Sequence, residues 1–281
     1  MSPLVAIVTD STAYLAPEAL ARHGIAVVPL TVVIGDEALE EGTEISAPAV
    51  AHALRRRHPV TTSRPSPAEF SAAYQAAAAA GADAIVSLHL SADFSGTYDA
   101  ALVAAKQAPV PVRVVDTGMV AMALGFTVLA AARAAEAGGA ADEVVAAAEK
   151  RAADTSAYFY VDTLDYLRRG GRIGAAQALF GSALAVKPLL RLADGRIELL
   201  EKVRTASRAI TRLEEIVVGQ AGTRQVDLAV HHLAAGERAA LLADRLRERV
   251  PGLGELVVSE VGAVIGAHAG PGLLGVVVSP H

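Results

Sequence analysis

Short, unbroken apolar runs recur along the first half of the chain, separated by segments of helical composition. The runs are LVAIVTD (4–10), DAIVSLHL (83–90) and VRVVDT (112–117). Strands that are apolar throughout, instead of alternating with polar residues, are typical of a parallel sheet covered by helices on both faces. The sequence therefore predicts an α/β fold with a mostly parallel sheet for this half.

The pattern changes after about residue 153. The stretch KPLLRLADGRIELLEKVR (187–204) predicts a β-hairpin that turns at Asp194 and Gly195. Further strands alternate with helices up to the end of the chain. We therefore expect two α/β domains, residues 1–153 with the mostly parallel sheet and residues 154–281 with a mixed sheet.

The composition excludes several classes of protein. The chain has no cysteine, which excludes disulfides, thiolate catalysis and Cys-ligated metals. The first residues lack the features of a signal peptide, and the longest apolar run, near 119–132, is shorter than a membrane span. We expect a cytoplasmic protein with no stable membrane insertion.

Hydroxyl-rich segments follow the predicted strands of the first domain. They are TDST (9–12), TTSRPSP (61–67) and SADFSGTY (91–98). In open α/β sheets, ligands bind beyond the carboxyl ends of the strands, where helix N-termini favour an anion. Thr62, Ser63 and Ser95 are therefore candidates to bind a carboxylate or a phosphate. Each segment alone also fits an ordinary helix cap, and Ser66 with Glu69 matches a capping box.

A single histidine, His268, lies among glycines in the loop IGAHAGPGLLG (265–275), just before an apolar strand. A lone histidine in apolar surroundings is most simply a structural residue. The glycines around it favour a close approach of the backbone to another segment or to a ligand.

Basic residues concentrate between Arg168 and Arg212. This segment contains ten Lys or Arg and three Asp or Glu, although the whole chain carries a net charge of −5. This region is either a solvated face or a docking surface for an acidic or phosphate-bearing partner. Aromatic residues do not interleave with these charges, so we expect no nucleic-acid binding.

The sequence motifs support catalysis only as an alternative to ligand binding. The chain has no P-loop and no dinucleotide fingerprint, and we expect no cofactor and no metal. Ser95 and His268 would serve a stand-alone serine hydrolase or acyltransferase as nucleophile and base. However, FSGT is not the G-x-S-x-G elbow, and no carboxylate is placed by sequence to orient the histidine.

Taken together, the motifs resemble those of the DegV family of bacterial fatty-acid-binding proteins. The matching stretches run in the same order along the whole chain: VAIVTDST, TTSRPSP, SADFSGTY, YLRRGGRI, KPLL, DG, KVRT and IGAHAGPGLLG. The pair S-G-T-Y and H-x-G-P-G makes the set specific.

The resemblance implies a two-domain α/β protein that holds one long acyl chain in a tunnel between its domains. By motif, Thr62 and Ser95 would contact the carboxylate, with Ser63, the Gly96 backbone and His268 beside them. Such proteins present the fatty acid to a separate ATP-dependent kinase subunit, which phosphorylates the carboxylate to an acyl phosphate. The chain itself would then not be an enzyme, and Arg172 and Arg204 would lie near the docking face for the kinase.

One position departs from this resemblance. Arg64 stands where the family more often has glutamine, within T-S-Q-P-S. An added cation there either strengthens anion binding or points to solvent.

Overall fold

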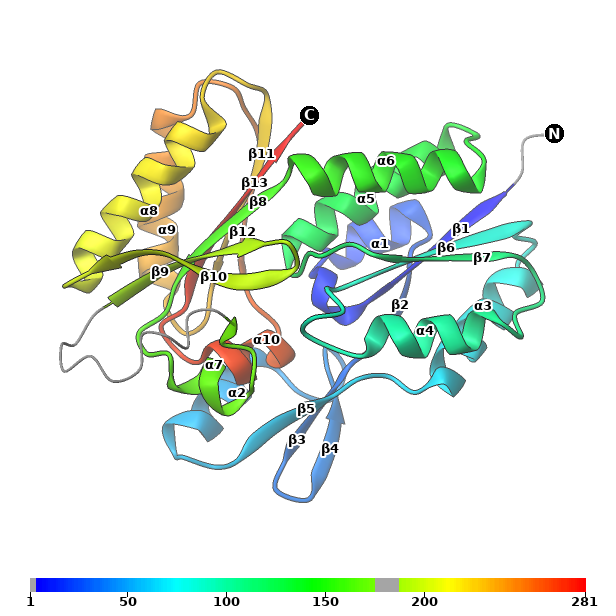
Figure 1. Ribbon diagram of the computed structural model, residues 1–281, viewed down its shortest axis with the longest axis horizontal. Coiled ribbons are helices and arrows are strands. Elements are labelled where there is room, and N and C mark those ends of the chain that lie inside the picture. Colours follow the sequence, from blue (N-terminus) through cyan, green and yellow to red (C-terminus); the bar gives the residue numbers. More distant parts are fainter. Residues whose placement is uncertain (1–3, 175–186) are drawn as a thin grey trace. The chain divides into compact units, whose positions relative to one another are not determined.

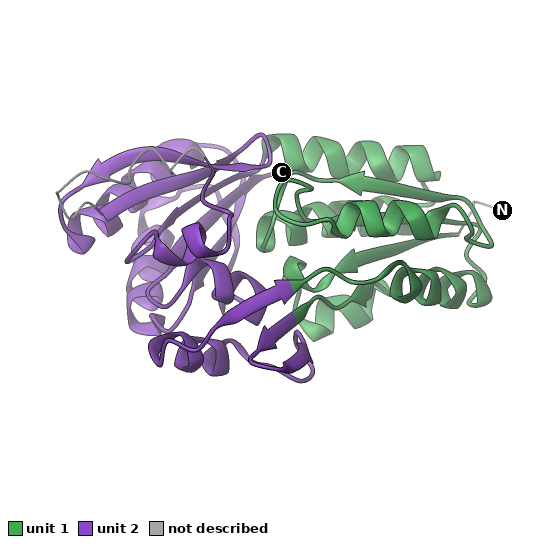
Figure 2. Cartoon of the chain, turned by 60° about the horizontal axis from the view of Figure 1, so that its bottom comes forward, with its two compact units in different colours: residues 1–31, 63–154 green, residues 32–62, 155–281 purple. Residues whose placement is uncertain are grey.

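The computed structural model describes residues 4–174 and 187–281 (Figure 1). The chain divides into two compact units, which Figure 2 shows in different colours. Unit 1 comprises Met1–Thr31 and Ser63–Asp154, and unit 2 comprises Val32–Thr62 and Thr155–His281. Within residues 4–174 and 187–281, none of the helices combines the length and apolar character that crossing a bilayer requires.

Unit 1 is built on a four-stranded sheet of order β2-β1-β6-β7, in which all pairs are parallel. Its strands are β1 (Val5–Asp10), β2 (Ala26–Val28), β6 (Ala84–His89) and β7 (Val112–Asp116). Its helices are η1 (Ser11–Ala13), α1 (Pro17–His23), α3 (Pro67–Ala79), α4 (Thr97–Ala105), α5 (Met122–Glu136) and α6 (Ala141–Asp154). The predicted parallel sheet is confirmed.

Helices cover both faces of this sheet. On one face, α3 and α4 pack Phe70, Tyr74 and alanines such as Ala101 against Val8 and Ile85 of the strands. Helices α5 and α6 lie on the other face, together with α1 (Figure 1). Alanine on α4 lets the helix approach the strands closely, and strands buried on both sides have no polar face to show.

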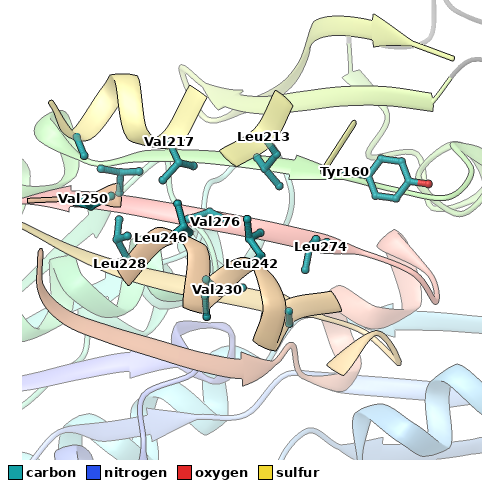
Figure 3. Packing of buried hydrophobic residues seen from close by; sticks show 14 of the residues in the cluster. Tyr160, Leu213, Val217, Leu228, Val230, Leu242, Leu246, Val250, Leu274 and Val276 are labelled. Atoms are coloured by element: carbon teal, nitrogen blue, oxygen red, sulfur yellow. The ribbon is translucent and has the colours of Figure 1, made fainter. Parts of the chain in front are cut away.

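Unit 2 contains a six-stranded mixed sheet of order β10-β9-β8-β13-β11-β12, in which only β11 and β12 pair in parallel. Its strands are β8 (Ser156–Tyr160), β9 (Lys187–Ala193), β10 (Arg196–Val203), β11 (Val226–His232), β12 (Leu253–Glu260) and β13 (Leu274–Pro280). Its larger helices, α8 (Ala206–Ala221) and α9 (Gly236–Arg249), pack on the sheet through leucine and valine side chains (Figure 3). The predicted mixed sheet is confirmed.

The β9–β10 hairpin turns where the sequence predicts. Asp194 has φ 48° and Gly195 has φ 74°, so both central residues adopt the left-handed conformation. This pair of angles is typical of a type I′ turn, whose twist matches that of the two flanking strands.

One segment groups differently from the expected division into residues 1–153 and 154–281. Residues 32–62 belong to unit 2. They carry most of the three-stranded sheet β4-β3-β5 and the whole of one helix. The elements are β3 (Thr31–Ile34), β4 (Glu37–Glu40), α2 (Ala47–Arg55) and β5 (Val60–Ser63).

Contacts with helix α10 (Ala263–Ala269) account for this grouping. The buried Glu41 Oε1 accepts a hydrogen bond of 2.8 Å from the backbone N–H of Val264, in the first turn of α10. Helix α2 packs against the same helix, with Val50 beside Gly266. Because these partners are more than 200 residues apart, no local pattern in the sequence indicates them.

Candidate functional site

Thr62 and His268 form a hydrogen-bonded pair in unit 2. The distance between Thr62 Oγ1 and His268 Nε2 is 2.8 Å. Thr62 lies on β5, and His268 lies in the last turn of α10. The expected loop around His268 is therefore wrong, because residues 263–269 form a helix that Glu41 caps. Thr62 was expected in the first domain, and it belongs instead to the strand that accompanies α10.

The imidazole of His268 lies directly on the backbone of Gly170. A β-carbon at Gly170 would be 2.1 Å from Nδ1, closer than any side chain allows. Gly170 follows the short helix α7 (Asp165–Arg169), and Arg172 Nη1 donates a hydrogen bond of 2.5 Å to its carbonyl oxygen. Residue 170 must therefore be glycine, because the imidazole of His268 occupies the space that a side chain would need.

The ring is neutral at physiological pH. Burial, together with the positive charge of Arg172, lowers the pKa of His268 to about 4. His268 Nδ1 is buried and has no hydrogen-bond partner in the part of the chain that the structure describes. We assign the single ring proton to Nε2, because the other tautomer would bury an unpaired N–H beside a cation.

This tautomer decides what Thr62 offers to a ligand. With the proton on Nε2, the ring donates to Thr62 Oγ1 and occupies one acceptor position of the hydroxyl. The hydroxyl proton then remains available for an acceptor other than His268. The pair therefore presents an oriented O–H donor without a positive charge on the ring.

The Gly-Pro-Gly turn after α10 fits against the same chain segment as His268. A β-carbon at Gly270 would be 2.0 Å from the ring of Tyr166, and one at Gly272 would be 2.0 Å from the carboxylate of Asp162. Both glycines also have positive φ, 75° and 91°. The side chains of residues 162 and 166 therefore fill the space that these glycines leave open, as His268 does at Gly170.

A second group of predicted residues lies in unit 1, at the start of α4. Ser95 Oγ is 2.8 Å from Thr97 Oγ1, and the Ser95 N–H donates to the carbonyl of Ser91 at 3.3 Å. Gly96 is the residue before the helix, so no side chain at this position caps the first turn. The side chain of Arg64 lies over Gly96, whose β-carbon would be 2.1 Å from Arg64 Nη1.

The predicted residues thus form two separate groups, one within each unit. Thr62 and His268 are in contact in unit 2, and Ser95, Gly96 and Arg64 lie together in unit 1. Ser63 follows Thr62 in the chain and is exposed. Its hydroxyl donates to the Arg64 carbonyl at 3.3 Å.

The two predicted docking arginines have different environments. Arg172 is half-buried beside Gly170 and His268, whereas Arg204 is exposed at the end of β10. Arg191 pairs with Glu198, and Arg212 pairs with both Glu201 and Glu215. These ion pairs neutralise part of the basic stretch, but among the described residues Arg204 has no such partner.

Ser95 and His268, the two residues of the hydrolase alternative, each have a hydrogen-bond partner within their own unit. Ser95 Oγ is 2.8 Å from Thr97 Oγ1 in unit 1, and His268 Nε2 is 2.8 Å from Thr62 Oγ1 in unit 2. Within residues 4–174 and 187–281, no three His, Asp or Glu side chains gather to hold a metal.

Sequence reasoning missed Glu41 and Gly170, which position His268. A signal existed for Gly170, because two glycines end a short helix in YLRRGG. No signal marked Glu41, whose partner is a backbone N–H far along the chain.

The chain is similar to proteins of one family over nearly its whole length. The family model described as "Uncharacterised protein, DegV family" matches residues 4–281. A DegV domain-containing protein of Streptomyces coelicolor is 75% identical over 279 residues, which cover 99% of both chains. A DegV domain-containing protein of Mycobacterium bovis is 39% identical over 275 residues, or 98% of this chain and 96% of the relative.

Solved structures give the same result. A DegV family protein from Thermus thermophilus, described for its fatty acid binding, superposes with a TM-score of 0.93 at 34% identity and covers 99% of both chains. DegV from Bacillus subtilis, described as a fatty acid binding protein, superposes with a TM-score of 0.92, also at 34% identity, and covers 100% of both chains.

Proposed function

The chain belongs to the DegV family, and we propose that it binds the carboxylate of a long-chain fatty acid. The observation that carries the proposal is the 2.8 Å pair of Thr62 and His268, in which a neutral ring orients a hydroxyl donor. The fatty acid binding described for the Thermus and Bacillus relatives supports the choice of ligand.

Physical chemistry favours neutral donors for this ligand. An acyl tail of about fifteen CH₂ groups contributes about 0.8 kcal/mol per group on burial, before association costs. Removing the carboxylate from water opposes binding unless several donors meet it. Thr62 supplies one oriented donor, and we assign Ser63, Ser95 and the backbone at Gly96 as further ligand contacts.

The proposal extends to the fate of the ligand. The chain presents the bound carboxylate to a separate ATP-dependent kinase subunit, which phosphorylates it to an acyl phosphate. A carboxylate held by neutral hydroxyls keeps its oxygen nucleophilic, whereas a close ion pair between the carboxylate and an arginine would reduce that nucleophilicity. Arg172 and the exposed Arg204 are the candidate docking residues for the kinase. The chain contributes no catalytic group of its own.

Two measurements test the binding. Native mass spectrometry of the protein purified from bacteria should detect a bound long-chain fatty acid. Thr62→Val should weaken oleate binding about tenfold or more, the order expected for losing a hydrogen bond to a charged group. Thr62→Ser should retain most of the affinity.

Thr61→Val is the matched control, because Thr61 is exposed on the same strand and its side chain points to the opposite face. It should leave oleate binding unchanged. Protein that carries no lipid, and whose melting temperature does not rise with oleate or palmitate, would rule out the proposed function.

The hydrolase alternative makes a different prediction. A stand-alone hydrolase would cleave an activated ester, and both Ser95→Ala and His268→Gln would abolish the turnover. Absence of such turnover in the lipid-free protein would eliminate this alternative.

A further inference from the structure

A chain of four buried polar side chains runs through the core of unit 1. Tyr74 Oη donates to Ser87 Oγ at 2.9 Å, Ser87 Oγ is 2.7 Å from His89 Nε2, and His89 Nδ1 is 3.1 Å from Asp10 Oδ2. All four residues have 0% exposure. They come from α3, β6 and β1, so the chain crosses the covered sheet from a helix to the end of the first strand.

One arrangement of protons satisfies every member. Tyr74 donates to Ser87, the Ser87 hydroxyl donates to His89 Nε2, and His89 Nδ1–H donates to Asp10. This requires the neutral ring with its proton on Nδ1. The negative charge then stays on Asp10, and no lysine or arginine among the described residues forms an ion pair with it.

Asp10 is the point where this chain meets the backbone. Its Oδ1 accepts from the Thr12 N–H at 3.0 Å and from the Thr12 hydroxyl at 2.6 Å. Its Oδ2 accepts from the Leu90 N–H at 3.0 Å in addition to His89. One carboxylate therefore fixes the residues that follow β1 and the residue that follows β6.

The segment that starts at Leu90 is the one that carries Ser95. Ser91 organises it, because its carbonyl accepts from the N–H groups of Phe94 and Ser95 and its hydroxyl accepts from the N–H of Asp93. Ser91 follows Leu90, whose N–H donates to Asp10, and the N–H of Ser91 itself donates to the carbonyl of Met119 at 2.9 Å. The geometry thus connects the buried carboxylate with Ser95 through a single turn.

Stability alone does not account for such a chain. Buried polar groups are expensive, and replacing a buried ionic cluster by well-packed apolar residues is often neutral or stabilising. The groups that do act on ligands require a supporting shell that holds them in place.

We infer that Asp10 is a positioning residue, which holds the segment 91–96 so that Ser95 and Gly96 recognise an ionised headgroup. This inference rests on the proposed function for its ligand. It assigns Asp10 no contact with the fatty acid.

Asp10→Asn tests the inference through headgroup selectivity. Oleate and oleyl alcohol share the acyl chain and differ in the headgroup, so the ratio of their affinities isolates recognition of the carboxylate. The variant should lose about tenfold in oleate affinity and keep its affinity for oleyl alcohol. If Asp10 acted only through its negative charge, the variant would bind oleate more tightly, which would overturn the inference.

A second readout does not depend on the ligand. In lipid-free Asp10→Asn protein, amide hydrogen exchange of residues 91–96 should be faster than in lipid-free wild type, whereas exchange of β6 should change less. If wild-type protein binds neither oleate nor oleyl alcohol, the proposed function fails, and exchange alone still decides the positioning role. Unchanged exchange at 91–96 would overturn it.

Thr12→Val provides a milder change in case Asp10→Asn does not fold. It removes one of the four hydrogen bonds to Asp10 and should reduce oleate affinity about threefold, with a matching change in exchange. Thr127→Val is the control, because the buried Thr127 hydroxyl donates to the carbonyl of Ala123 within its own helix α5. A control that changes the oleate to oleyl alcohol ratio as much as Thr12→Val would also overturn the inference.

Discussion

His268 Nδ1 lies against the α-carbon of Gly170, where a β-carbon would be only 2.1 Å away. The other ring nitrogen is 2.8 Å from Thr62 Oγ1. The absence of a side chain at residue 170 therefore determines where the ring sits, and the ring determines how the Thr62 hydroxyl is oriented. A backbone feature and a ligand-facing donor are linked through one imidazole.

Gly170→Ala should displace the ring and break its bond with Thr62. We expect oleate affinity to fall about tenfold, the order for one lost hydrogen bond to a charged group. Titration calorimetry measures the affinity, and urea unfolding should show a loss of about 1–3 kcal/mol from overpacking.

Gly219→Ala is the control, because nothing lies within 4 Å of its β-carbon position in α8. That change should leave binding intact and stabilise the helix by about 0.5–1 kcal/mol. Unchanged oleate binding in Gly170→Ala would contradict the proposed link.

Stability should fall in mild acid because of His268. Its pKa is lowered to about 4 in the folded state, against about 6.5 for an ordinary histidine. Above about pH 6.5 the ring is neutral in both states, so it adds no pH dependence. Between about pH 6.5 and about pH 4 only the unfolded chain takes up the proton, and stability decreases by up to about 3 kcal/mol.

Subtracting the unfolding free energy of His268→Gln from that of the wild type isolates this effect. His231, whose pKa burial also lowers to about 4, titrates in both proteins and cancels. The difference should shrink as the pH falls through this window. A His268 ring that titrates near pH 6.5 by NMR would refute the assignment.

Glu41→Ala should loosen α10. The carboxylate is buried and accepts the Val264 N–H, so its loss leaves a helix terminus without its cap. The expected cost is about 1–3 kcal/mol, with faster amide exchange in residues 263–269. Glu44→Ala is a suitable comparison, since Glu44 is an exposed side chain that bonds the Glu40 N–H. Equal exchange rates in α10 for both variants would argue against the role of Glu41.

Arg204→Glu should separate docking from lipid binding. Arg204 is exposed at the end of β10, so reversing its charge should leave oleate affinity unchanged. With oleate, ATP and a bacterial fatty acid kinase subunit, acyl phosphate trapped by hydroxylamine should fall about tenfold or more, because charge reversal at an interface is strongly unfavourable. Arg22→Glu, at an exposed position of α1, serves as the control and should have no effect. Acyl phosphate formed at the wild-type rate by Arg204→Glu would remove Arg204 from the docking face.

Local chemistry made several elements predictable. The capping box at the start of α3 forms as expected, with the Ser66 N–H donating to Glu69 Oε2 at 2.6 Å and the Glu69 N–H donating to Ser66 Oγ at 3.4 Å. The turn at Asp194 and Gly195 also forms where predicted. In each case, neighbouring residues determine the backbone angles and the caps, so a few letters of sequence suffice.

The partners of His268 were decided only by the tertiary structure. Thr62 is 206 residues away from it, and Glu41 is 223 residues from the Val264 N–H that it caps. The sequence placed His268 in a loop and residues 32–62 in the first domain, because nothing local reveals contacts with a helix at the other end of the chain. The sequence by itself determined the strands, the turns and the residue types able to meet a carboxylate. Which of them meet is a matter of long-range packing, since a hydrogen bond requires its two atoms within about 3 Å and only the folded chain brings them there.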